Sequence, residues 1–119
     1  MIKMSETEAL IFGGRTKDGK FSNALKIVKL TSEKEISVSV KNVENNFPAL
    51  ASSSLIQLNE KRFLILGGIS SNGEISDLAI EFSLNEFENV ENVKTTRLPF
   101  GVYGHTIVLK IFVSLFQNL

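Results

Sequence analysis

Apolar and polar residues alternate along two stretches of this chain, at residues 36–40 and 78–84. The period of two is typical of half-buried β-strands, because successive side chains of a strand point to opposite faces. A shorter apolar run, Phe63–Leu66, ends abruptly at a pair of glycines, which indicates a strand buried on both faces. No stretch of comparable length carries a helical stripe. The pattern predicts an all-β protein.

Turn signals separate these apolar segments. They are Asp18-Gly19, Asn59-Glu60, Asn72-Gly73 and Asn85-Glu86. Asn, Asp and Gly favour the backbone angles of tight turns, so the spacing predicts a meander of short antiparallel strands.

The sequence also contains an internal repeat. Residues 10–30 align with residues 64–84 without a gap, each position lying 54 before its counterpart. The identical pairs are Leu10/Leu64, Ile11/Ile65, Gly13/Gly67, Gly14/Gly68, Gly19/Gly73, Ser22/Ser76 and Leu30/Leu84. A second correspondence, spaced by 51, pairs Pro48 with Pro99, Ser54 with His105, Ile56 with Ile107 and Leu58 with Leu109. The repeating unit is therefore about 50 residues long.

The repeat divides the chain into three parts. Residues 1–45 are expected to form a partial unit with strands at 9–12, 24–30 and 35–40, which are the second to fourth strands of a sheet. Residues 46–95 are expected to form a complete unit with strands at 51–58, 63–66, 78–84 and about 87–93. Residues 96–119 would hold the first strand of a further unit at 105–109, followed by an atypical apolar tail.

A period near 50 built from four short strands is typical of a β-propeller blade. Residues 63–68, followed by Ser76-Asp77-Leu78, resemble the kelch motif, in which a double glycine ends the second strand of each blade. Residues 99–106 resemble the lead into the innermost strand. The Trp that the family usually has in its fourth strand is missing, and Phe87 stands near that position. The resemblance implies an incomplete propeller of about two antiparallel four-stranded kelch-type blades. It also implies structural roles for Gly13, Gly14, Gly67, Gly68, Asp77, Gly104 and His105.

Two blades cannot close a ring, because closed propellers typically have four to eight blades. Two explanations follow. The chain is a fragment of a longer propeller, which we favour, or several copies associate to complete one.

Composition narrows the range of functions. The 119 residues carry 13 basic and 13 acidic side chains, so the absence of a polycationic surface argues against nucleic-acid binding. The chain has no Cys and one His, which excludes disulfides and Cys-ligated metal. The N-terminal residues lack the apolar core of a secretory signal, and the apolar C-terminal stretch is too short to span a bilayer. We expect a cytoplasmic or nuclear protein with no membrane partner.

The sequence gives little support for catalysis or for metal or cofactor binding. His105 is the sole candidate general base, and no neighbouring carboxylate or nucleophile completes a catalytic group. Glu86, Glu88 and Glu91 are typical of a solvated outer strand and do not predict a metal site. Neither double glycine fits a phosphate-binding loop pattern. We predict no catalytic residue, no metal and no cofactor.

The remaining candidates lie in the polar loops after the double glycines, at residues 15–21 and 69–75. The resemblance implies that such loops contribute to partner binding, so Arg15, Lys17 and Lys20 are candidate contacts. The expected function is a non-enzymatic protein-interaction or scaffold module. One alternative is a propeller region attached to an enzyme, such as a tRNA wybutosine-synthesising methyltransferase-like protein. Another is a truncated product without function, whose sign would be insoluble protein.

Overall fold

The computed structural model describes residues 1–41 and 47–103. Within these residues the chain forms eight β-strands and no helix. The first four strands are β1 (Ile2–Lys3), β2 (Glu8–Phe12), β3 (Leu25–Leu30) and β4 (Ile36–Lys41). The second four are β5 (Ser54–Gln57), β6 (Arg62–Leu66), β7 (Leu78–Leu84) and β8 (Val90–Arg97).

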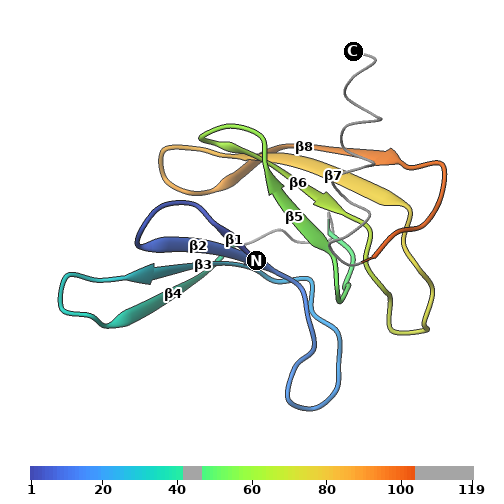
Figure 1. The fold of residues 1–119 in the computed structure, drawn as a ribbon, viewed down its shortest axis with the longest axis horizontal. Coiled ribbons are helices and arrows are strands. Elements are labelled where there is room, and N and C mark those ends of the chain that lie inside the picture. Colours follow the sequence, from blue (N-terminus) through green and yellow to red (C-terminus); the bar gives the residue numbers. More distant parts are fainter. Residues whose placement is uncertain (42–46, 104–119) are drawn as a thin grey trace.

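The strands build two separate four-stranded antiparallel sheets. In each sheet the spatial order of the strands is the order along the chain, β1 to β4 and β5 to β8. The first strands of the two sheets, β1 and β5, lie next to each other, and from there the sheets fan outward to the edge strands β4 and β8 (Figure 1). The prediction of an all-β protein with two blade-like units that do not close into a ring is confirmed.

The two repeated stretches have the same backbone hydrogen bonds. The N–H of Gly19 donates to the carbonyl of Thr16 (3.0 Å), and that of Gly73 donates to Ser70 (2.9 Å). The turns that join the last two strands of each sheet match as well. The N–H of Lys34 donates to the carbonyl of Thr31, and the N–H of Glu88 donates to the carbonyl of Asn85, each at 2.9 Å. Lys34 and Glu88 both adopt positive φ angles. The sequence repeat is thus a structural repeat.

The first sheet has one strand more than the sequence predicted. The expectation was three strands, but Ile2–Lys3 pairs with β2 as a fourth. Ile2 pairs with Leu10 in the same way that Ile56 pairs with Leu64, so the repeat begins at residue 2. Two residues are too few to show a period of two, which is why the pattern did not reveal this strand.

The last strand of the second sheet begins later than predicted, at Val90 instead of about residue 87. A turn occupies the residues before it, because the side-chain oxygen of Asn85 accepts the N–H groups of Phe87 (2.9 Å) and Asn89 (3.0 Å). Such Asx turns compete with strand pairing. Phe87 is therefore an exposed turn residue and does not fill a core position.

The segments that follow each sheet correspond with a spacing of 52 and not 51. Leu50 donates its N–H to Ser22 (3.2 Å), and Val102 donates to Ser76 (3.0 Å), so Leu50 and Val102 are equivalent. The predicted pairings with His105, Ile107 and Leu109, and the predicted strand at 105–109, lie outside the described residues.

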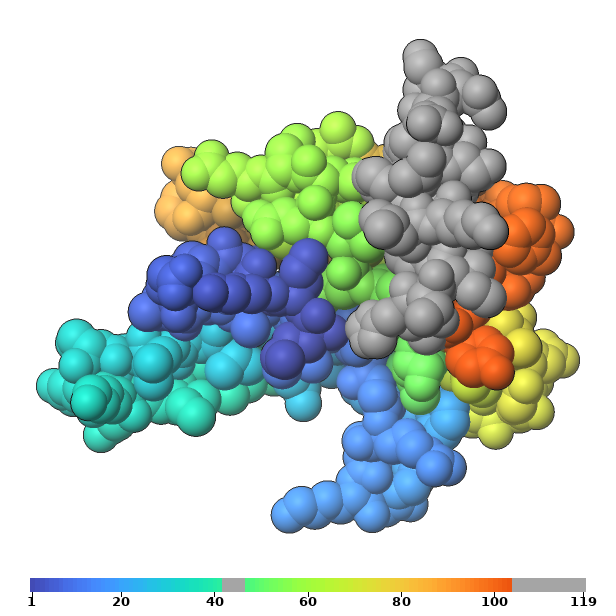
Figure 2. All heavy atoms as spheres, in the orientation of Figure 1, coloured from blue at the N-terminus to red at the C-terminus, as the bar shows by residue number. Residues whose placement is uncertain are grey.

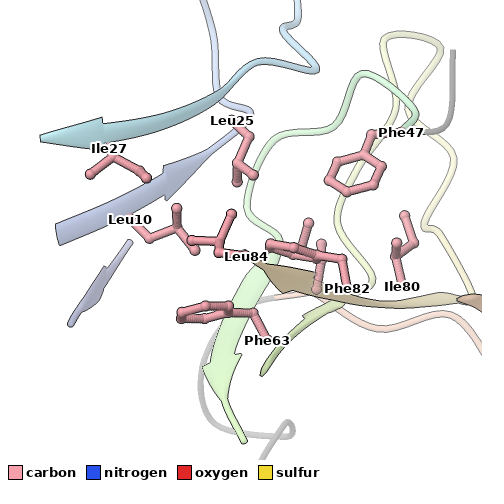
Figure 3. Close-up of a cluster of buried hydrophobic side chains, with 9 residues drawn as sticks. Leu10, Leu25, Ile27, Phe47, Phe63, Ile80, Phe82 and Leu84 are labelled. Carbon is pink, nitrogen blue, oxygen red and sulfur yellow. The ribbon is translucent and has the colours of Figure 1, made fainter. Parts of the chain in front are cut away.

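The main hydrophobic core lies between the two sheets (Figure 3). Leu10, Leu25 and Ile27 of the first sheet meet aromatic and aliphatic side chains of the second. The rings of Phe63 and Phe82 stack with their centroids 5.6 Å apart. Fully burying each such side chain stabilises the fold by about 1.5–3 kcal/mol, so this packing joins the two sheets into one body.

The alternating strands meet this core differently. Ile80, Phe82 and Leu84 are buried, and the run Phe63–Leu66 is buried on both faces, as predicted. Residues 36–40, in contrast, were expected to be half-buried, and this expectation is wrong. Ile36, Val38 and Val40 are 72%, 55% and 63% exposed. The face of β4 that carries these side chains points away from the second sheet, so nothing among the described residues covers it.

Candidate binding surface at the glycine loops

A double glycine ends the second strand of each sheet at a crossing of two chain segments. Gly13 and Gly67 have φ angles of 68° and 61°, which residues with a Cβ atom rarely adopt. A Cβ on Gly13 would lie 2.3 Å from the carbonyl oxygen of Leu50, and one on Gly67 would lie 2.0 Å from that of Val102. The glycines are needed because the segment after each sheet passes directly over this point.

The second glycine of each pair fixes that segment. The N–H of Gly14 donates to the carbonyl of Leu50 (2.9 Å), and the N–H of Gly68 donates to Val102 (2.8 Å). The double glycine therefore sets where the following loop leaves the sheet.

The two loops after the double glycines share one internal framework. The hydroxyl of Thr16 donates to Asp18 and to the carbonyl of Lys20 (3.1 Å). The hydroxyl of Ser70 donates in the same way to Asn72 and to the carbonyl of Glu74 (3.3 Å). Both loops project at the same end of their sheets, toward the bottom of Figure 1, and the first one stands out as a separate protrusion in Figure 2.

The first loop carries the predicted basic residues, and all three are exposed. The guanidinium of Arg15 lies 5.2 Å from the centre of the Phe21 ring, a distance typical of a cation–π contact. Lys20 lies 4.0 Å from the carboxylate of Asp18. The hydrogen bond from Thr16 lowers the pKa of Asp18. The structure thus brings Arg15, Lys17 and Lys20 together on one loop.

The second loop presents different chemistry on the same backbone. Residues 69–75 contain one charged side chain, Glu74, and the partly exposed Ile75. Residues 15–21 contain three basic side chains and Asp18, a balance of +2, whereas the second loop has a balance of −1. Because the two loop backbones match, any difference in what the loops bind must come from their side chains.

Asp77 acts as an anchor beside the second loop. Its carboxylate accepts a hydrogen bond from the guanidinium of Arg97 (2.6 Å), and its carbonyl accepts the N–H of Leu98 (2.6 Å). Asn23, at the equivalent position of the first sheet, donates its side-chain amide to the carbonyl of Phe47 (3.1 Å). Both residues tie the segment after the sheet to the start of the third strand. Gly104 and His105 lie outside the described residues.

Of the three acidic side chains that the sequence analysis considered, Glu88 forms an ion pair and Glu91 accepts a hydrogen bond from the side-chain amide of Asn85 (2.8 Å). Glu88 pairs with Lys29 of the first sheet, and Glu8 lies 3.6 Å from the same ammonium. The hydrogen bond with Glu88 raises the pKa of Lys29. The described part of the chain contains no group of three or more residues able to hold a metal ion. It also contains no helix long and apolar enough to cross a membrane.

Sequence patterns gave no sign of a pocket on the outer face of the second sheet. This pocket, of about 560 Å³, has an apolar floor that includes Leu64, Leu66 and Ala79. Charged side chains such as Arg62 and Glu81, which form an ion pair, line it as well. It depends on the register of three strands, which no local pattern encodes.

Comparison with known protein families and with curated proteins gives no match for this sequence.

Proposed function

We propose that this chain is a non-enzymatic protein-interaction module built from kelch-type propeller blades. The double-glycine loops carry the proposal, since the same tight crossing recurs at Gly13 and Gly67 with the same hydrogen bonds. Two four-stranded sheets that fan out from adjacent first strands support it as well. Repeat folds of this kind offer extended surfaces to partners without chemistry of their own.

The partner binds at the loop end of the sheets. Three exposed cations on a protruding loop suit an acidic protein surface, and the Arg15–Phe21 contact holds one of these cations in place. The less charged second loop adds hydroxyl and amide groups at the same end of its own sheet. Among residues 1–41 and 47–103, no arrangement favours an enzyme-associated propeller over this binding role.

A matched charge reversal tests the proposal. Proteins captured by the wild-type chain are identified and purified. Their Kd is then measured for the wild type and for the loop variant Lys17→Glu/Lys20→Glu. The control is Lys34→Glu/Lys61→Glu, which reverses two exposed lysines in turns at the opposite end of the sheets. We expect the loop variant to raise the Kd at least tenfold and the control to change it less than twofold. Equal losses in both variants would show that the loop is not the contact.

A further inference from the structure

The outer strand of the first sheet, β4, lacks the features that keep edge strands from pairing. It lies at the side of the molecule (Figure 1), and its register with β3 is continuous along its whole length. Its residues before Lys41 are serine, valine and isoleucine, and the strand contains no proline. Ile36, Val38 and Val40 are exposed. Natural proteins interrupt such edges with charges, proline or bulges, because an open edge is a template for pairing with another strand.

The equivalent edge strand of the second sheet, β8, has these protective features. Glu91, Lys94 and Arg97 place charges along it. A shift in its pairing with β7 marks a bulge, and Asn92 beside this shift has a positive φ of 55°. A bulge twists the edge and interrupts its row of free hydrogen-bonding groups. The same position in the repeat is therefore protected in the second sheet and unprotected in the first.

The backbone groups at the open edge of β4 belong to its apolar residues. The N–H of Leu30 donates to the carbonyl of Thr7 (2.8 Å), so the backbone of Leu30 faces the β2 side and does not bond to its partner Ile36. Bonded and non-bonded pairs alternate along an antiparallel ladder. Every second residue of β4 from Ile36 onward thus turns its N–H and C=O away from β3, toward the open edge. These residues are Ile36, Val38 and Val40.

The segment 35–41 is complementary to itself when two copies run antiparallel. With a two-fold axis at Val38, this residue lies opposite its own counterpart, and Ile36 lies opposite Val40. The outward backbone groups of these pairs can exchange hydrogen bonds, and their side chains form one apolar row. Any other register leaves at least one of the three apolar residues without an apolar partner.

Charges at the two ends of this segment match as well. In the same register, Glu35 of each copy lies opposite Lys41 of the other. Opposite charges across an antiparallel pair stabilise it, and like charges destabilise it. A parallel, in-register pair would instead place each charge beside its like. Glu35 is exposed and Lys41 partly exposed, and neither forms an ion pair with another residue that the structure describes.

We propose that β4 pairs antiparallel with β4 of a second copy of this chain, about a two-fold axis at Val38. The pairing joins the first sheets of the two copies into one continuous sheet. Because a two-fold contact uses the same strand on both copies, it closes at a dimer and leaves no unpaired β4 for a third copy. The contact does not involve the glycine loops, so it stands independently of the proposed partner site.

Single cysteines test the register, because the chain has none of its own. Residues opposite each other in a bonded antiparallel pair have Cα atoms about 5.5 Å apart, which is within disulfide range. We expect Val38→Cys to form a disulfide-linked dimer under mild oxidation. Ile36→Cys is the matched control, since the two copies of residue 36 lie on opposite sides of the axis. It should cross-link at least about tenfold more slowly.

Sedimentation over a range of concentrations tests the pairing without a covalent link. We expect the wild-type chain to form a dimer and nothing larger. Val38→Lys would place two ammonium groups opposite each other and should raise the dimer Kd at least about tenfold. Leu30→Lys is the control, because Leu30 is exposed on the same face but lies on β3, and it should change the Kd less than about twofold. Circular dichroism checks that each variant is folded.

A charge exchange tests the ends of the pairing. Glu35→Lys and Lys41→Glu each put like charges opposite each other at both ends, so each variant should dimerise more weakly than the wild type at low salt. Each variant carries the charge that the other needs. An equimolar mixture of the two should therefore recover a dimer that contains one copy of each.

Four results would overturn the proposal. The first two are a wild-type chain that stays monomeric at about 100 µM and one that assembles beyond a dimer. The third is equal cross-linking of Val38→Cys and Ile36→Cys, which would exclude the register. The fourth is an equal effect of Val38→Lys and Leu30→Lys on the dimer Kd, which would show that the edge of β4 is not the contact.

Discussion

The two sheets share a backbone and differ in what covers them. Leu30 and Leu84 are the same residue at the same place in the repeat, one turn before the last strand. Leu84 is 6% exposed, because it packs between the sheets, whereas Leu30 is 46% exposed. Local structure therefore follows from the repeat itself, but burial follows from having a neighbour on the correct side.

This comparison explains why one sheet anchors the molecule. The second sheet contacts the first sheet through the face that carries Phe63, Phe82 and Leu84, and it provides five of the nine side chains of the main core. In the first sheet, the face that carries Leu10, Leu25 and Ile27 packs against the second sheet. The opposite face, with Leu30, Val38 and Val40, keeps the apolar pattern of a buried surface but is exposed.

The largest contrast between the sheets is expected from removing the same leucine in each. Leu84→Ala leaves a cavity in the core and should lower the free energy of unfolding by about 3 kcal/mol. Leu30→Ala removes a half-exposed side chain and should cost less than about 1 kcal/mol. Urea denaturation measures both values. Equal losses would mean that the two leucines are buried alike.

A smaller contrast is expected between the second glycines of the two pairs. A Cβ on Gly68 would lie 2.3 Å from the Ser53 hydroxyl and 2.9 Å from the Ala51 carbonyl oxygen, but a Cβ on Gly14 would meet nothing within 4 Å. Both have positive φ angles, so both alanine variants lose about 1 kcal/mol to backbone strain. Gly68→Ala should lower the free energy of unfolding by about 2 kcal/mol more, since the added Cβ forces the chain around it to shift. Thermal unfolding measures the stability of both variants. A lower Tm for Gly14→Ala than for Gly68→Ala would contradict this prediction.

The smallest effect is expected at the ion pair between the sheets. The raised pKa of Lys29 means that its charged form stabilises the fold below the ordinary lysine pKa of about 10.4. This stabilisation is lost as the pH rises through the higher pKa of the folded state. Because the side chain is 41% exposed, the contribution is below about 1 kcal/mol.

Lys29→Met should remove this part of the pH dependence. Unfolding free energies of the wild type and the variant, measured from pH 9 to 11, should converge at the alkaline end. Lys26→Met is the matched control, since Lys26 is an exposed lysine on the same strand. A pH slope of Lys29→Met that equals the wild-type slope would show that the pair adds nothing to stability.

Local features were predictable because they depend on neighbours in the sequence. The strands that contain Phe63–Leu66 and residues 78–84, and the turn at Gly73, all followed from apolar periodicity and turn residues. The two-residue strand at Ile2–Lys3 did not, because pairing with Leu10 and not its own pattern makes it a strand. The placement of Arg15, Lys17 and Lys20 on an exposed loop also followed, whereas the Arg15–Phe21 contact needed the loop geometry.

The sequence alone determined the strand pattern, the turns and the repeat, because each is set by residues a few positions apart. Only the tertiary structure decided which of two equivalent faces is covered. Ile36, Val38 and Val40 have the alternation of a half-buried strand, yet they are exposed. Burial depends on the contact between whole sheets, and a strand's own residues carry no information about whether a neighbouring sheet is present.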